Sequence, residues 1–356
     1  MSYDRERDAY VAPTAKGQAT LTLDPKIQGK LERFLSDGKV PWGAAVLIEP
    51  KTGRVIAMAE HSRAEPGARG ISLRALAPAA SIFKIVTSAA LLQQGIDADH
   101  EVCFHGGRHR LQPGLLRDDP RRDHKCATLT DALGHSTNVV FAKLASRGLS
   151  SDLLRSEASR FLFNTEIPFS WRVEPSTADI PDDDFRLAET AAGFGPVRMS
   201  PLHAALIGAM VANGGSFVAP RIVESADGVS LPAAAPRQLI EPEIASELAR
   251  MMRTTVTEGT ARRAFRQDFR SSRSPLHGVE VAGKTGSLAD RSPYRDYSWF
   301  VGFAPVDDPQ VAIAVVVVNE KLWHVRATQV AREGLAAYFS EHRELRAAAA
   351  PTKKRR

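Results

Sequence analysis

Strand-like runs lie near both ends of this chain, and helical patterns fill the region between them. Residues 43–50 and 54–59 are apolar runs joined by a Lys-Thr-Gly turn, which predicts a hairpin. Short turns separate three further strand-like runs, which favours an antiparallel meander over parallel crossover units: residues 279–282, 298–303 and 311–318. We therefore expect an α+β fold with one five-stranded antiparallel sheet, flanked by helices and built from both chain ends, and a mostly helical lobe inserted in the middle.

Apolar residues recur at helical spacing between about residues 79 and 94, and Gly95 is placed to end that helix. Pro25 suits the first turn of an earlier helix that runs to about Ser36. Further helical patterns cover residues 127–144, 189–192, 201–212, 241–257 and about 327–339.

These patterns predict one domain over residues 20–345. Residues 20–95 and 265–345 would form the sheet lobe, and residues 96–264 the helical lobe. A loose N-terminal tail is expected over residues 1–19 and a basic disordered tail over residues 346–356.

Composition excludes several classes of protein. The chain has 356 residues, of which 43% are hydrophobic and 25% charged, so it is neither disordered nor fibrous. Part of the net charge of +6 lies in the basic run 353–356, and no nucleic-acid motif accompanies it, so we predict no nucleic-acid partner. The charged residues 1–8 do not resemble a secretion signal, and the apolar run 311–318 is too short to cross a bilayer. If the protein works outside the cytoplasm, its export signal or anchor was removed, was misassigned or lies upstream of Met1.

The two cysteines leave three alternatives open. Cys103 and Cys126 flank a loop rich in Arg, His, Gly and Pro, and a disulfide between them would suit an oxidising compartment. They could also be free thiols, or join His105 and His124 in a zinc site, although this spacing matches none of the usual zinc patterns.

Three short motifs carry the candidate chemistry. In chain order, they are Ser81 with Lys84, Ser136 with Asn138, and the run Lys284, Thr285, Gly286 and Ser287. Each alone is weak, since Ser36 with Lys39 and the Lys-Thr-Gly run at 51–53 repeat two of them. Their joint order, on a helix, at a helix-like segment and after a late strand, predicts one shared site.

Serine and lysine three residues apart on a helix face the same side, which pairs a nucleophile with a base. Lys84 can accept the Ser81 proton only if its ammonium form is disfavoured, and burial together with the Lys284 charge would lower its pKa. A helix N-terminus at Ser81 would also direct backbone N–H groups toward the developing oxyanion.

The other two motifs supply the remaining parts of an acyl-transfer site. Ser136 can relay a proton, and Asn138 can hold a substrate amide through its donor and its acceptor. Lys284 and Thr285 would bind a substrate carboxylate. Gly286 would let a ligand lie close to the strand, and the Ser287 N–H would complete an oxyanion hole.

This set of motifs resembles the transpeptidase domain of penicillin-binding proteins, in the superfamily of penicillin-interacting acyl-serine transferases and serine β-lactamases. Other segments resemble that domain in the same order: residues 22–28, 48–58, 201–205, 212–215, 258–260 and 299–303. The resemblance covers about residues 20–340 and implies the β-lactamase/transpeptidase-like fold.

The resemblance also implies a peptidoglycan D,D-transpeptidase that cross-links stem peptides through a serine acyl-enzyme, is acylated by β-lactams and needs no cofactor or metal. It implies a site in the periplasm or on the outer face of the inner membrane, with cell-wall synthesis proteins as candidate partners.

Three departures alter this expectation. The segment 75–80 lacks the Pro-Gly pair common there, and Ile85 stands where Pro often follows the lysine. The residues before the match are also too few for the anchor and extra domain of larger relatives.

Three alternatives share the same acylation chemistry. Water could attack the acyl-enzyme, giving a D,D-carboxypeptidase or a serine β-lactamase. The domain could also be a non-catalytic sensor of β-lactams or cell-wall fragments. No Glu-x-x-Leu-Asn stretch follows Ser136, which argues against one β-lactamase class only.

Overall fold

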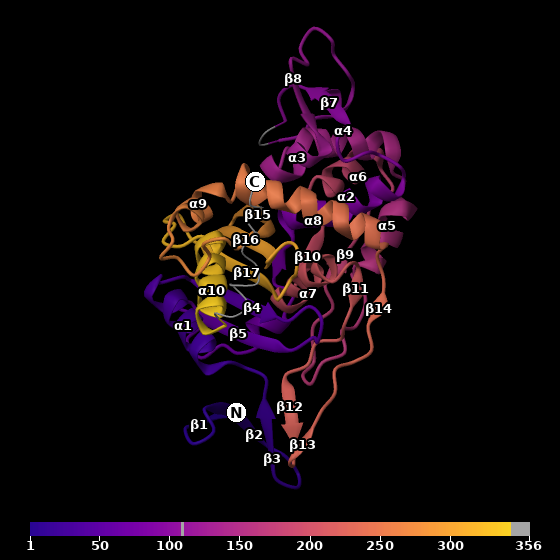
Figure 1. The fold of residues 1–356 in the computed structure, drawn as a ribbon. Coiled ribbons are helices and arrows are strands. Elements are labelled where there is room, and N and C mark those ends of the chain that lie inside the picture. The colour runs from indigo at the N-terminus through magenta and orange to yellow at the C-terminus, as the bar shows by residue number, and fades with distance from the viewer. Residues whose placement is uncertain (108–109, 343–356) are drawn as a thin grey trace, which may run out of the picture.

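The computed structural model describes residues 1–107 and 110–342. Its central sheet has five strands in the order β15-β16-β17-β4-β5, and every neighbouring pair is antiparallel (Figure 1). The strands are β15 (Ala282–Arg291), β16 (Tyr294–Ala304), β17 (Val311–Asn319), β4 (Trp42–Ile48) and β5 (Val55–Ser62). The predicted sheet, built from both ends of the chain, is confirmed.

The central strand β17 shows why this sheet is covered on both faces. Every residue of its run Val311–Asn319 is buried. Alternate residues, such as Val315 and Val316, join two different apolar clusters, because successive side chains point to opposite faces of a strand. One cluster includes α1 (Pro25–Asp37) and α10 (Ala327–Glu341), and the other includes α7 (Pro201–Ala212). Three layers result, with the sheet in the middle.

The remaining helices gather mainly on the α7 side and above the sheet in Figure 1. They are α2 (Lys84–Gln93), α3 (Leu129–His135), α4 (Asn138–Gly148), α5 (Ser151–Arg160), α6 (Asp184–Ala191), α8 (Pro242–Thr257) and α9 (Arg262–Arg270). Short 3₁₀ turns are η1 (Ile71–Leu73), η2 (Ala80–Phe83) and η3 (Pro113–Leu116). In the described part of the chain, no helix is both long and apolar enough to span a membrane.

A second five-stranded sheet corrects the expectation of a disordered tail over residues 1–19. Its order is β1 (Ser2–Asp4), β2 (Ala9–Pro13), β3 (Gln18–Leu21), β12 (Val223–Ala226) and β13 (Val229–Ser230). The segment is polar, but β3 pairs with β12 about 200 residues later, which local sequence cannot reveal. This sheet forms the lower arm in Figure 1. The expected basic tail over 346–356 lies outside the described residues.

Three other boundaries differ from expectation. The strand expected at 279–282 instead begins at Ala282 and continues to Arg291, so the Lys-Thr-Gly run lies inside it. The helical pattern 127–144 is interrupted at Ser136, between α3 and α4. Helix α7 falls in the expected helical lobe but packs against β4, β16 and β17, so it belongs to the sheet layers.

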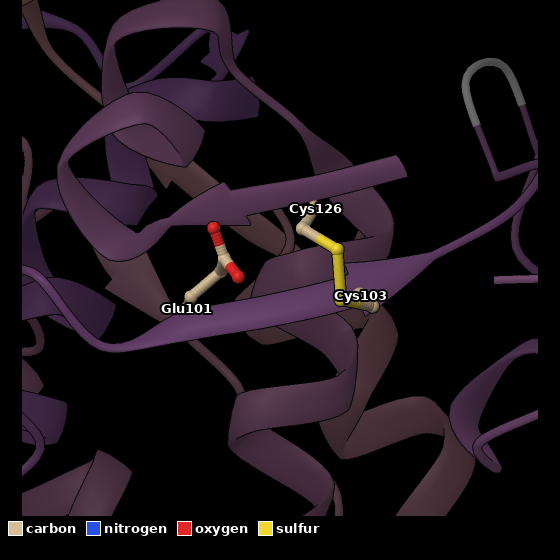
Figure 2. A group of neighbouring side chains, drawn as sticks. All are labelled: Glu101, Cys103 and Cys126. Atoms are coloured by element: carbon tan, nitrogen blue, oxygen red, sulfur yellow. A yellow bond between two sulfur atoms is a disulfide. The ribbon is translucent and has the colours of Figure 1, made fainter. Parts of the chain in front are cut away.

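Small strand pairs complete the fold: β6 (Ala77–Pro78) and β9 (Thr177–Ala178) flank β10 (Val197–Met199), and β11 (Ser216–Phe217) pairs with β14 (Arg237–Gln238). Strands β7 (Glu101–Phe104) and β8 (Lys125–Thr128) form a hairpin in which Cys103 faces Cys126 across the ladder. The two sulfurs form a disulfide, with Glu101 beside them (Figure 2). Of the three alternatives, the structure has the disulfide, and His105 Nδ1 contacts Asp123 Oδ1.

Candidate active site

Ser81 and Lys84 lie in one turn at the start of the buried helix α2. Ser81 is in the 3₁₀ turn η2, and α2 begins at Lys84. Side chains three residues apart eclipse in such a turn, and Lys84 Nζ lies 2.9 Å from Ser81 Oγ. The residue before the serine, Ala80, has a left-handed φ of 49°, so the turn is sharp and strained.

Gly193 supports this strained turn from the opposite side. Its φ is +90°, and a Cβ there would lie 2.6 Å from the Ala80 carbonyl oxygen and 3.0 Å from Ser81 Cα. Only glycine meets both conditions without displacing the turn. The preceding residue, Ala192, places its carbonyl oxygen 2.7 Å from Lys84 Nζ.

The surroundings of Lys84 hold its amine in a state suited to accept a proton. Its side chain is completely buried, and the pKa is lowered well below the usual value by burial first and by the nearby Lys284 charge second. Nζ contacts three oxygens: Asn138 Oδ1 at 2.7 Å, Ala192 O at 2.7 Å and Ser81 Oγ at 2.9 Å. A neutral amine donates two hydrogen bonds. The Asn138 Oδ1 and Ala192 O atoms can only accept, so the lone pair of the amine is left for the Ser81 hydroxyl.

Ser136 and Asn138 lie at the break between α3 and α4. Ser136 ends α3 with a left-handed φ of 57°, and the Thr137 N–H bonds back to Ala132 O. Helix α4 then begins at Asn138, whose side chain meets Lys84. The interruption of the predicted helix is therefore what turns both polar side chains toward the nucleophile.

Strand β15 brings the third motif to the same place. Lys284 is completely buried, and its Nζ donates to Ser136 Oγ at 3.0 Å and to Thr285 O at 2.7 Å. Burial lowers the pKa of Lys284 to about 7. Gly286 lets β15 pack against η2, since a Cβ there would lie 3.2 Å from Ile82 Cγ1.

These residues border a cavity of about 350 Å³. Of the residues predicted from sequence, the cavity lining includes Ser81, Ser136, Asn138, Thr285, Gly286 and Ser287. Lys84 and Lys284 lie buried behind Ser81 and Ser136, and contact them. All three motifs therefore meet in one cleft. A larger hollow of about 560 Å³ between the N-terminal strands and α1 contains none of the motif residues.

Six lining residues lie outside the three motifs: Thr260, Ser298, Trp299, Trp323, Arg326 and Thr328. Thr260 follows α8, and its Oγ1 lies 2.6 Å from Thr285 Oγ1. Ser298 and Trp299 belong to β16, and Trp323, Arg326 and Thr328 come from the segment between β17 and α10 and from the first turn of α10. The segments 258–260 and 299–303 carry the family resemblance and contain Thr260 and Trp299, whereas nothing in the local sequence marks the other four residues.

The second copies of the serine–lysine and Lys-Thr-Gly motifs lie away from the cleft. Lys51, Thr52 and Gly53 form the turn between β4 and β5, where Gly53 has φ +68° and a Cβ would lie 2.3 Å from Ala219 O. Lys39 lies just after α1, and neither copy lines the cleft.

Comparison with known proteins identifies the family to which this chain belongs. Residues 43–337 match the family model "Penicillin binding protein transpeptidase domain". The chain is 27% identical over 345 residues to peptidoglycan D,D-transpeptidase PbpA of Mycobacterium tuberculosis, covering 85% of this chain and 67% of PbpA. It is also 27% identical to stage V sporulation protein D of Bacillus subtilis, covering 89% of this chain and 52% of that protein. The chain thus spans about half to two thirds of the length of these relatives.

Solved structures share the fold. The D,D-transpeptidase domain of a peptidoglycan glycosyltransferase from Eggerthella lenta superposes with a TM-score of 0.75 at 24% identity, covering 96% of this chain and 92% of that one. The imipenem acyl-enzyme complex of penicillin-binding protein A from M. tuberculosis gives a TM-score of 0.72 at 25% identity, covering 90% of this chain and 79% of that one. Because the family model matches residues 43–337, which are most of this chain, the chain belongs to the penicillin-binding protein transpeptidase domain family.

Proposed function

We propose that this chain is a peptidoglycan D,D-transpeptidase that cross-links stem peptides through an acyl-enzyme on Ser81. The observation that carries the proposal is the 2.9 Å contact between Ser81 Oγ and a completely buried lysine amine whose pKa is lowered. The name of the relative PbpA, a peptidoglycan D,D-transpeptidase, supports the choice of substrate.

In the acylation half-reaction, Ser81 Oγ attacks the carbonyl carbon of the terminal peptide bond, and Lys84 takes the hydroxyl proton. The new C–O bond forms, the C–N bond breaks, and Ser136 passes the proton on to the leaving nitrogen. Backbone N–H groups of Ser81 and Ser287 stabilise the oxyanion, as preorganised donors do in acyl-transfer enzymes. Asn138 positions both Lys84 and the substrate amide.

The terminal carboxylate of the substrate binds at Thr285, and Lys284, buried behind Ser136, attracts it through its charge. Thr260 extends this group of donors, since its hydroxyl contacts that of Thr285. In the second half-reaction, the amine of a neighbouring stem peptide attacks the ester carbonyl, Ser81 leaves and recovers its proton, and a cross-link forms. No residue in this scheme requires a cofactor.

Location and ligands follow from the same proposal. The substrate lies in the cell wall, so the catalytic domain works outside the cytoplasm, in the periplasm or on the outer face of the inner membrane, near other cell-wall synthesis proteins. β-Lactams acylate Ser81, in line with the imipenem acyl-enzyme known for penicillin-binding protein A.

A labelling and chase experiment tests the proposal. One sample of the protein is labelled with fluorescent penicillin and chased in buffer, and a second, unlabelled sample is given a peptide ending in D-Ala-D-Ala with and without an amine acceptor. We expect covalent labelling and a product that forms only when the acceptor is present.

The other outcomes separate the alternatives. Rapid loss of label in water would indicate a β-lactamase, and D-alanine release without acceptor product would indicate a carboxypeptidase. Permanent labelling with no turnover of the peptide would indicate a sensor. Each of these results would replace transpeptidation as the assigned function.

A further inference from the structure

The active-site cleft continues beyond the carboxylate-binding residues along helix α9. A second hollow, of about 590 Å³, shares Thr260, Arg326 and Thr328 with the catalytic cavity and also includes Arg263. A third hollow, of about 530 Å³, shares Arg263 with the second and extends to Arg262 and Arg266. The three hollows form a path that leads from Ser81 past Thr260 and along α9.

This path is basic. Within residues 1–107 and 110–342, Arg262, Arg263, Arg266 and Arg326 form no salt bridge, although all four are exposed. Arg332, by contrast, is neutralised in the same groove by Asp268 at 2.6 Å and by Glu333 at 2.5 Å.

Acidic groups near the path leave an excess of positive charge. Glu258 lines the third hollow, and Glu333 lies in the second but is paired with Arg332 and Lys30. Near Arg326 lies Asp296, which accepts a hydrogen bond from Trp323. The Arg326 guanidinium itself lies over the Trp323 ring, 4.9 Å from its centre, which holds it at the mouth of the groove.

The chemistry of the proposed reaction indicates what enters this groove. The leaving nitrogen of the donor belongs to a residue whose carboxylate sits at Thr285. The attacking amine replaces that nitrogen, and by microscopic reversibility it approaches along the same path. The acceptor peptide therefore extends away from Ser81, past Thr285 and Thr260, which is where the basic groove begins.

We propose that the groove along α9 is a subsite for the acceptor strand and that Arg263, with Arg326, binds a carboxylate of that strand. The inference rests on the proposed transpeptidase function and adds a specificity to it: acidic acceptors are preferred over their amides. Its ligand is a peptide carboxylate, because the groove is continuous with the catalytic cavity and not a separate surface.

Competition between two acceptors tests the subsite. The acceptors are short peptide amines that differ only in carrying glutamate or glutamine, and product formation is measured for each with the same D-Ala-D-Ala donor. The intact protein should prefer the glutamate acceptor about fivefold in kcat/KM, the scale of one exposed ion pair. Arg263→Gln should lower the preference to about twofold or less, and Arg263→Glu should invert it.

A matched control lies on the same helix. Arg270 is exposed at the far end of α9 and lines none of the three hollows, so Arg270→Gln removes the same charge without changing the groove. We expect it to keep the preference of the unmodified protein. Because exposed ion pairs are screened, the preference should also shrink between low salt and about 0.5 M salt.

Several results would overturn the inference. These are equal use of both acceptors by the unmodified protein, an unchanged ratio in Arg263→Gln, or an equal loss in Arg270→Gln. Arg263-dependent binding to phosphatidylglycerol vesicles, with an unchanged acceptor ratio, would assign the patch to a membrane surface instead. If penicillin labels Ser81 but no acceptor gives product, transpeptidation itself fails, and the acceptor subsite with it.

Discussion

Replacing Lys284 with methionine should make the protein more stable at pH 7 while it abolishes function. Lys284 is completely buried, and burial lowers its pKa from 10.5 to about 7. Between these two pH values the unfolded chain binds a proton that the folded protein holds only in part. Each pH unit between the two pKa values changes the free energy of unfolding by about 1.4 kcal/mol. Burying Lys284 therefore lowers the free energy of unfolding by about 4 kcal/mol at pH 7.

Methionine removes this cost because it carries no proton, but it also removes two hydrogen bonds, to Ser136 Oγ and Thr285 O. At about 1 kcal/mol each, their loss leaves a net stabilisation of about 2 kcal/mol at pH 7. The sign of the pH dependence follows from the lowered pKa. In the unmodified protein, the contribution of Lys284 to stability rises from about pH 7 to pH 10.5 and is constant below about pH 7.

Urea unfolding of both proteins at pH 7, 8, 9 and 10 measures the effect. The variant should be more stable by about 2 kcal/mol at pH 7, the two proteins should be about equal near pH 9, and the variant should be less stable by about 1 kcal/mol at pH 10, while acylation by fluorescent penicillin is lost at every pH. Lys321→Met is the control, since Lys321 is exposed, and it should change neither stability nor its pH dependence. A Lys284→Met variant that is less stable than the unmodified protein at pH 7 would refute the reasoning.

Three further changes test the site and its supports. Lys84→Met should slow penicillin acylation by about 10²–10⁴-fold, because the proton acceptor is lost, and a rate within tenfold of normal in stopped-flow labelling would show that Lys84 is not the base. Gly193→Ala should lower both the melting temperature and the acylation rate, since its Cβ would lie 2.6 Å from Ala80 O, whereas Gly29→Ala, with open space around it, should do neither. Replacing Cys103 and Cys126 together with serine should cost about 3 kcal/mol in urea unfolding, as expected for a cross-link 23 residues apart. An unchanged unfolding midpoint would contradict that stabilising role.

The motifs could be predicted from sequence because their chemistry is local. Serine and lysine three residues apart place both side chains on one face, whether the turn is α-helical or 3₁₀. The strands of the central sheet were also predictable, because β17 is buried on both faces and reads as an unbroken apolar run.

The errors have a common physical cause, which is pairing between distant segments. The N-terminal strands look polar and loose, yet β3 gains its hydrogen bonds from β12. Arg326 lines the cleft only because α10 begins beside β16, where the Ala327 N–H donates to Ser298 Oγ at 3.1 Å. Ser136 adopts a left-handed conformation that interrupts the predicted helix. Its partner, Lys284, is 148 residues away in the sequence. No window of local sequence contains such partners.

The claim that Ser81 is the nucleophile of this site is tested most directly by locating the penicillin adduct. The protein is treated with penicillin, digested and examined by mass spectrometry, in parallel with Ser81→Ala. We expect one adduct, on the peptide that contains Ser81, and none in the variant, with the melting temperature of the variant close to that of the unmodified protein. An adduct on another residue, or undiminished labelling of Ser81→Ala, would contradict the account.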